Sequence, residues 1–221
     1  MRNWDATAAR RPAYGELDHA AQLRSPASIA AAIANGPQAR QILDLAPDTW
    51  YASKTITISQ SNVTLRGRGG ATRIQLQRGV NAALLVVTGD DVTIEGIAFL
   101  TESGTGATPE YAISVTGNNC TIRNCTFDGF YRTITATDNL RMMVTGNRFK
   151  SQSTSPVIDM NNTDYSVISG NIIETNATGN EIDLDAASLG NVVVGNIAVS
   201  GALYMPSATA HAANSPAATT F

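Results

Sequence analysis

The segment YSVISGNII (Tyr165–Ile173) indicates the fold of the chain, because near copies of it lie before and after it. RMMVTGNRF (Arg141–Phe149) and GNVVVGNIA (Gly190–Ala198) share its alternating apolar residues and its Gly-Asn pair. The three Gly-Asn pairs recur at intervals of 24 and 25 residues. A repeat of that length is typical of an architecture in which successive turns of chain stack on one another.

Three earlier segments extend the repeat toward the N-terminus. They are NVTLRGRG (Asn62–Gly69), DVTIEGIAF (Asp91–Phe99) and NCTIRNCTF (Asn119–Phe127). In each of the six segments an apolar residue stands two positions before a Gly or Asn, and these residues are Leu65, Ile94, Ile122, Val144, Ile168 and Val193. The pattern predicts a strand with one face turned inward in every repeat.

A second family of alternating strands interleaves with the first. Its predicted inward positions are Leu85/Val87, Ile113/Val115, Ile134/Ala136, Ile158/Met160 and Ile182/Leu184. Both families keep the same period, so each turn of chain must return to stack on the previous turn. The sequence therefore predicts an all-β chain folded as a parallel β-helix of about six coils, with strands about 4.8 Å apart between coils.

Both ends of the stack are expected to carry other structure, since open strand edges need covering. Residues 1–25 are interpreted as an arm, and residues 26–205 as the β-helix with a short cap helix near residues 28–35. Residues 206–221 are rich in Ala, Ser, Thr and Pro and show no strand period, which predicts an extended tail.

The Gly-Asn pairs are predicted to form the sharp turn between two strands of each coil. Glycine adopts a positive φ without cost, and asparagine adopts it more readily than most residues. The turn glycines are Gly146, Gly170 and Gly195, and Asn124, Asn147, Asn171 and Asn196 are predicted to stack as an internal amide ladder. Cys120 and Cys125 fall on inward positions, which favours two reduced, buried thiols over a disulfide.

Composition and charge exclude several classes of protein. The chain of 221 residues has a formal net charge of −3, with no apolar run long enough to span a membrane and no apolar leader typical of a secretory signal. Residues 1–78 carry ten Lys/Arg and five Asp/Glu, whereas residues 79–221 carry five and thirteen. This asymmetry indicates either different partners for the two ends or a solvated gradient. No nucleic-acid motif accompanies the basic half, and no cofactor or metal site is predicted.

The N-terminal part of the repeat resembles the pectate-lyase-like right-handed β-helix proteins. The resemblance rests on the turn Pro47–Tyr51, the strand Thr55–Ile58, and the spacing of Leu65, Gly67, Gly69, Thr72 and Ile74, and it extends over residues 28 to about 205. The family includes polysaccharide lyases and hydrolases, phage tailspikes and virion components without activity. The resemblance implies the fold and leaves these functions open.

The outer face of the second strand family contains the best candidate for catalysis. Asp159 and Asp183 are 24 residues apart, which is one coil, and Asp185 follows on the same face. Two carboxylates about 5 Å apart are typical of a retaining glycosidase, and their repulsion raises one pKa. The motifs of the family's hydrolases and lyases are missing, so a solvated or partner-binding acidic face is the alternative.

The sequence favours a structural role over an enzymatic one. Trp4, Arg10, Arg11 and Tyr14 are of the types enriched at protein interfaces, and they predict an arm that binds a partner, with a flexible polar leader as the alternative. The expected function is a non-enzymatic component of a phage-type virion, a homotrimer that contacts other capsid or tail proteins. A polysaccharide-binding or polysaccharide-cleaving protein acting on bacterial surface glycans is the second hypothesis.

Overall fold

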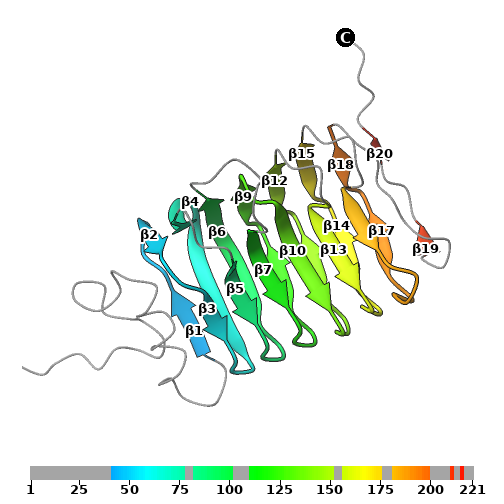
Figure 1. Ribbon diagram of the computed structural model, residues 1–221, viewed down its shortest axis with the longest axis horizontal. Helices are drawn as coiled ribbons and strands as arrows, with labels where there is room; N and C mark the ends of the chain where they lie inside the picture. Colours follow the sequence, from blue (N-terminus) through cyan, green and yellow to red (C-terminus); the bar gives the residue numbers. More distant parts are fainter. Residues whose placement is uncertain are drawn as a thin grey trace, which may run out of the picture.

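The computed structural model shows an all-β solenoid in which each turn of chain stacks on the turn before it (Figure 1). It describes residues 41–77, 82–101, 110–151, 156–175, 181–199, 210–211 and 215–216. Every strand pairing within these residues is parallel. The predicted parallel β-helix is confirmed, while the arm 1–25 and the cap helix near 28–35 lie outside the described residues.

A complete coil contributes three short legs, and equivalent legs pair from coil to coil. The first leg comprises β1 (Gln41–Asp44), the start of β4 (Val63–Leu76), the start of β6 (Thr93–Thr101), β8 (Thr121–Arg123), β11 (Met143–Thr145), β14 (Val167–Ser169), β17 (Val192–Val194) and β19 (Ala210–His211). The second leg comprises β2 (Asp48–Ala52), the ends of β4 and β6, β9 (Thr126–Asp128), β12 (Arg148–Ser151), β15 (Ile172–Thr175), β18 (Ile197–Ala198) and β20 (Ser215–Pro216). These two legs form one 14-stranded sheet.

The third leg forms a separate six-stranded sheet. Its strands are β3 (Ile56–Ile58), β5 (Ala83–Val87), β7 (Tyr111–Val115), β10 (Arg132–Thr137), β13 (Ile158–Asn161) and β16 (Ile182–Leu184). Each of these strands belongs to a different coil, so the sheet marks six successive turns. The two short strands β19 and β20 pair with β17 and β18, so the stacking continues past residue 205, where the sequence pattern predicts its end.

The core consists of columns of apolar side chains that run through the stack. All of the predicted inward residues of both strand families are buried, and the register aligns them coil by coil, as in the pairs Leu65–Ile94 and Ile168–Val193. In a second column the rings of Phe99 and Phe127 stack with centroids 5.1 Å apart, and those of Phe127 and Phe149 with centroids 5.0 Å apart. Aromatic stacking at this separation adds to the stabilisation from burial.

A ladder of buried asparagine amides follows the turn between the first and second legs. Asn171 Nδ2 donates to Asn196 Oδ1 at 2.8 Å, and Asn147 Nδ2 donates to Asn171 Oδ1 at 3.1 Å. The same oxygens accept the backbone N–H groups of Asn171 and Asn147. The residue before each amide, Gly146, Gly170 or Gly195, has a φ of 63° or 64°, so the chain turns sharply there.

Asn124 does not belong to this ladder, which corrects the prediction made for it. Asn124 is exposed with a φ of 52° and occupies the turn position that Gly146 occupies one coil later. The next residue, Cys125, is buried instead, and its backbone N–H donates to Asn147 Oδ1 at 2.9 Å. The inward member of this coil is therefore a thiol, and both cysteines are free and buried.

A second interior ladder lies five residues before the first and was not evident from the Gly-Asn repeat. The backbone N–H of Ser166 donates to Asn191 Oδ1 at 2.7 Å, and that of Met142 donates to Ser166 Oγ at 2.9 Å. Asn191 Nδ2 donates in turn to the carbonyl of Thr163 at 2.7 Å. These bonds satisfy backbone groups that the turn leaves without strand partners.

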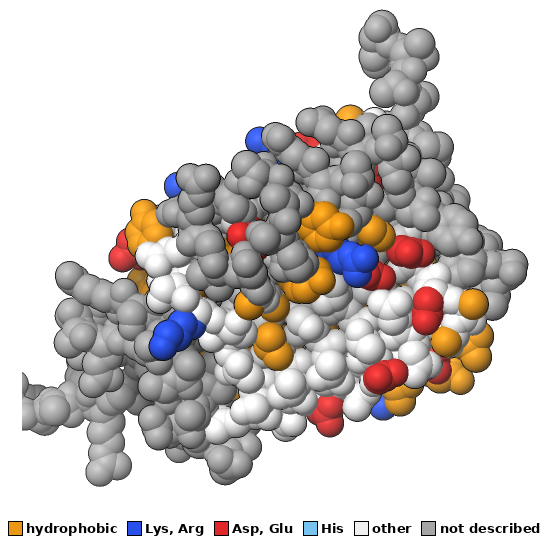
Figure 2. Space-filling model, viewed as in Figure 1, with side chains coloured by type: hydrophobic (Ala, Val, Ile, Leu, Met, Phe, Trp, Pro, Cys, Tyr) orange, Lys and Arg blue, Asp and Glu red, His pale blue; other side chains and the backbone are white. Residues whose placement is uncertain are grey.

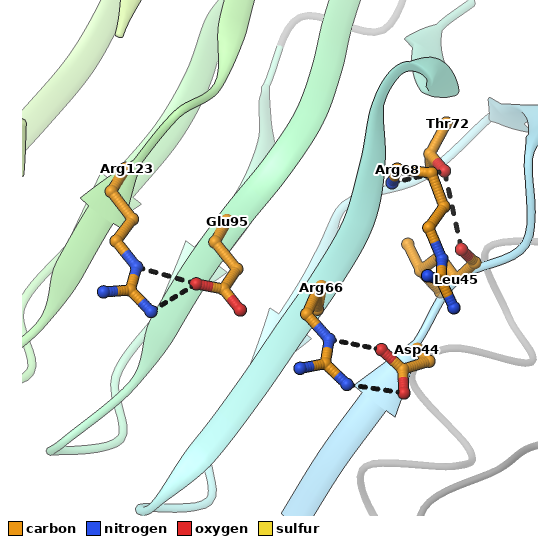
Figure 3. Close-up of polar contacts among 7 residues, drawn as sticks. All are labelled: Asp44, Leu45, Arg66, Arg68, Thr72, Glu95 and Arg123. Atoms are coloured by element: carbon orange, nitrogen blue, oxygen red, sulfur yellow. Dashed lines mark hydrogen bonds and ion pairs between the residues drawn. The ribbon is translucent and has the colours of Figure 1, made fainter. Parts of the chain in front are cut away.

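Charged residues of alternating sign form an outward column on the 14-stranded sheet. The register places Asp44, Arg66, Glu95 and Arg123 directly above one another in successive coils. Arg66 Nε lies 2.5 Å from Asp44 Oδ1, and Arg123 Nη2 lies 2.5 Å from Glu95 Oε2 (Figure 3). The alternation avoids like charges in direct cross-strand contact, which would destabilise the stack.

Candidate functional site

The candidate carboxylates lie near the C-terminal end of the six-stranded sheet. Asp159 belongs to β13 and Asp183 to β16, and the two are direct partners in the register between these strands. Each stands between two inward apolar residues, so alternation along the strand directs both side chains to the outer face. The structure therefore brings together the two carboxylates that the sequence spacing pairs.

Asp159 is buried by its neighbours, although it is on the outer face. Only 6% of its surface is exposed. Nη1 of Arg132, which comes from β10 in the preceding coil, lies 2.6 Å from Asp159 Oδ2. Asn161 Nδ2 donates to the other oxygen, Oδ1, at 3.1 Å. Both carboxylate oxygens are thus engaged, and the guanidinium compensates the charge that burial would otherwise penalise.

Asp183 has no such partner of its own and keeps part of its surface exposed. Burial raises the pKa of the Asp183 carboxyl above its ordinary value, and the negative charge of Asp159 raises it further. The positive charge of Arg132 opposes this rise, while Asp185 adds to it. Two carboxylates therefore share one guanidinium, and Asp183 is the member of the cluster best suited to exchange a proton.

Asp185 serves the turn that follows β16. Burial by itself would raise the pKa of the Asp185 carboxyl, but hydrogen bonds to it prevail and lower that pKa. Ser188 Oγ donates to Asp185 Oδ1 at 2.6 Å, and the backbone N–H of Asn162 donates to the same oxygen at 3.0 Å. The three acidic residues thus differ in role: one is ion-paired, one is partly exposed, and one holds a turn.

The surface around this cluster is acidic. On the face shown in Figure 2, side chains over the central coils are mostly uncharged, and acidic side chains gather toward the C-terminal coils. In the described part of the chain, no group of three or more His, Cys, Asp or Glu residues is arranged to hold a metal ion. No helix among those residues is long and apolar enough to cross a membrane.

Trp4, Arg10, Arg11 and Tyr14 lie outside the described residues. The pairing of Arg132 with Asp159 was missed by sequence reasoning, because Arg132 lies 27 residues earlier and the coil spacing there is 24. The contact between Asn161 and Asp159 could have been predicted, because Asn161 follows Asp159 by two positions on the same face of β13.

These features define a parallel β-helix protein with a polar, partly acidic outer face on its six-stranded sheet. The family model described as "Right handed beta helix region" matches residues 51–216, and the chain belongs to this family. This confirms the fold family that the N-terminal motifs indicate. None of the curated protein sequences matches the chain.

Solved structures of polysaccharide-acting enzymes share the fold. An alginate lyase from Paenibacillus sp. str. FPU-7 is 16% identical, with a TM-score of 0.57, over 79% of this chain and 64% of its own. A pectin methylesterase variant in complex with a hexasaccharide is 12% identical, with a TM-score of 0.56, over 77% of this chain and 60% of its own. This chain therefore spans less than two thirds of either enzyme. ORF18 of Geobacillus virus E2 is 15% identical, with a TM-score of 0.37, over 84% of this chain and 55% of its own.

Proposed function

We propose that the protein is a non-enzymatic structural component of a phage-type virion, joined to the particle by its N-terminal arm. The observation that carries this proposal is the state of the candidate carboxylates. Asp159 is buried in an ion pair with Arg132, and Asp185 is bonded into a turn. A retaining glycosidase needs two carboxylates facing one substrate bond, and this cluster offers Asp183 alone in that capacity.

Two further features support a structural role. The rod is stabilised throughout by interactions between coils, namely the amide ladder, the stacked phenylalanines and the column of alternating charge. The arm adds residue types common at interface hot spots, with Trp4 and Tyr14 beside Arg10 and Arg11. A rigid rod with an adhesive N-terminal segment suits a part that decorates or extends a larger particle.

Deletion of residues 1–25 tests this proposal. The truncated protein should keep the circular dichroism of a β-helix and lose incorporation into purified phage particles, measured by mass spectrometry. A variant in which Trp4 and Tyr14 alone become alanine should show the same loss with the full length of chain retained. Undiminished incorporation of both variants would contradict attachment through the arm.

A second candidate function is binding or cleavage of a bacterial surface polysaccharide at Asp183. The observation in its favour is specific: Asp183 is partly exposed, its pKa is raised, and the guanidinium of Arg132 lies in the same cluster. Such a carboxyl can act as a general acid, and the neighbouring guanidinium can orient a hydroxyl or carboxylate of a sugar. The fold shared with an alginate lyase and a pectin methylesterase is consistent with this alternative.

The two functions are separated by incubating the protein with capsular polysaccharide and lipopolysaccharide and measuring glycan length and retention. The structural proposal predicts unchanged glycans. Shortened glycans that disappear with Asp183→Asn, but persist with Asp128→Asn, would establish the second function. Asp128 is a suitable control because it is an acidic residue of β9 in the other sheet.

A further inference from the structure

The turn that leads from the six-stranded sheet into the 14-stranded sheet repeats with one geometry six times in the described part of the chain. Its central residue has a left-handed conformation, with φ between 55° and 67° at Asn62, Asp91, Asn119, Arg141, Tyr165 and Gly190. The backbone N–H of each of the first five donates to the carbonyl of the residue that precedes the next centre. Equivalent positions in the six coils can therefore be compared directly.

Three outward positions of this turn change in chemical character halfway along the rod. They are the residue before the centre, the centre, and the residue two positions after it. In the first three coils the triplets are Ser61/Asn62/Thr64, Asp90/Asp91/Thr93 and Asn118/Asn119/Thr121, and in the last three they are Leu140/Arg141/Met143, Asp164/Tyr165/Val167 and Leu189/Gly190/Val192. The polar triplets of the first three coils show that this fold does not require apolar side chains at these positions.

Four of the six apolar side chains at these positions in the last three coils are exposed, and Val167 and Val192 are half-buried. The exposed fraction is 38% for Leu140, 44% for Met143, 65% for Tyr165 and 50% for Leu189. Figure 2 shows apolar side chains gathered along the lower edge at the C-terminal end of the rod. We call Leu140, Met143, Tyr165, Val167, Leu189 and Val192 the C-terminal apolar patch. Adjacent exposed side chains of this kind mark an interaction surface.

Tyr165 shows that the patch is maintained against a conformational cost. Its φ of 55° is unfavourable for a bulky side chain, and the first three coils use Asn or Asp at this position. The ring lies against Gly190, where an added Cβ would come within 2.8 Å of Tyr165 Cδ1. The ring of Tyr165 thus occupies the space that a side chain at position 190 would need, and glycine at that position leaves room for it.

The charge around the patch indicates what covers it. Asp164 lies within the patch and the exposed Asp138 lies two residues before Leu140, and these two acids outweigh the exposed cation Arg141, whose Nε donates to Asn119 Oδ1 at 2.6 Å. The N-terminal coils offer the complement, since Tyr51 is 52% exposed and is accompanied by two exposed cations, Lys54 and Arg73, against one exposed acid, Asp48. The same opposition holds along the whole chain, because residues 1–78 have a balance of +5 and residues 79–221 a balance of −8.

We infer that the C-terminal apolar patch binds the Tyr51/Lys54/Arg73 surface of a second copy of this chain. Such a contact joins two different surfaces, so it is a heterologous contact between copies. Apolar and aromatic side chains supply the affinity, and the opposed charges set the orientation. This inference goes beyond the virion proposal and does not depend on it.

Sedimentation velocity of the full chain over a range of protein concentrations tests the inference. The unaltered protein should associate, and added salt should weaken the association. The double variant Tyr165→Asn/Leu189→Ser should be monomeric and fully folded, because Asn tolerates the left-handed turn. Lys54→Glu/Arg73→Glu should also be monomeric, whereas Thr93→Ala, on the polar half of the turn column, should associate normally.

The decisive measurement is a mixture of the two monomeric variants. Each retains the surface that the other lacks, so the mixture should form a one-to-one complex. A monomeric unaltered protein, continued association of either variant, or a mixture that stays monomeric would overturn the inference. Retention of a glycan by a monomeric protein, lost with Tyr165→Asn, would also overturn it and assign the patch to a saccharide.

Discussion

Asn171 shows how much one buried amide contributes to this fold. Its Oδ1 accepts from the backbone and side chain of Asn147, and its Nδ2 donates to the carbonyl of Val144 at 2.9 Å and to Asn196. The amide therefore links one coil to the coils on both sides of it. A side chain without hydrogen-bonding groups would leave buried donors and acceptors unsatisfied.

We expect Asn171→Ala to lower the free energy of unfolding by about 1–3 kcal/mol, the typical cost of leaving a buried polar group unpaired. Urea denaturation measures this change. Asn124→Gly is the matched control, because Asn124 is exposed at a left-handed turn position that glycine also accepts. Equal stability of Asn171→Ala and the unaltered protein would contradict the role given to the ladder.

Asp183 should make the stability of the protein depend on acidity. Its pKa is raised above the ordinary value of 3.8 in the folded state, so the folded chain binds the proton more tightly than the unfolded chain. The stabilisation of the folded state that the Asp183 carboxyl contributes is therefore present below pH 3.8. This stabilisation is lost as the pH rises through the folded-state pKa of Asp183.

Asp183→Asn should consequently raise the melting temperature near neutral pH, and the advantage over the unaltered protein should vanish in acid. Melting curves recorded from pH 3 to pH 8 would reveal this difference in slope. A constant difference between the two proteins across that range would show that Asp183 is not perturbed in the folded state.

At the scale of the elements, the second legs of the middle coils are held by one aromatic column. Phe127 of β9 lies between Phe99 of β6 and Phe149 of β12, and all three rings are fully buried. The strands themselves are short, so packing between coils supplies most of their stability. Loss of the central ring would leave a cavity that two strands border.

Phe127→Ala should reduce the free energy of unfolding by about 3–5 kcal/mol, as for other buried aromatic residues. Ile172→Ala in β15 is the control, since Ile172 faces outward and is 41% exposed. Chemical denaturation of the two variants in parallel measures both effects. A cost for Phe127→Ala as small as that for Ile172→Ala would mean that the column does not stabilise the stack.

For the whole molecule, the reactivity of the two buried cysteines measures how readily the stacked coils separate. Burial raises the pKa of Cys120 to about 11 and that of Cys125 to about 12. Few thiolates therefore exist near neutral pH, and both sulfur atoms are covered by neighbouring coils.

Thiol labelling at pH 8 should therefore be slow in the native protein and should accelerate with urea in parallel with the loss of circular dichroism. Mass spectrometry of labelled peptides distinguishes the two sites. Rapid labelling of Cys125 without unfolding would indicate that the middle coils open locally. Cys125→Ala serves to identify the signal from Cys120.

The coil of this protein can be predicted from its amino-acid sequence, because the two periods of the sequence have direct physical causes. Alternation in steps of two fixes which side chains face inward, and the spacing of 21 to 29 residues fixes which strands meet. The columns through Leu65 and Phe99, and the stacking of Asn147, Asn171 and Asn196, follow from these two regularities.

The contacts that each outward residue makes with the neighbouring coils could not be predicted from the sequence and depend on the folded structure. Arg132 reaches Asp159 from three positions off the repeat, and Asn124 lies exposed at the turn instead of stacking with the other asparagines. Tyr165 packs on Gly190 because the turn places them in adjacent coils. The sequence period predicts which way a side chain points and how long each coil is. Charge compensation and burial, however, depend on side chains that come together only when the coils stack.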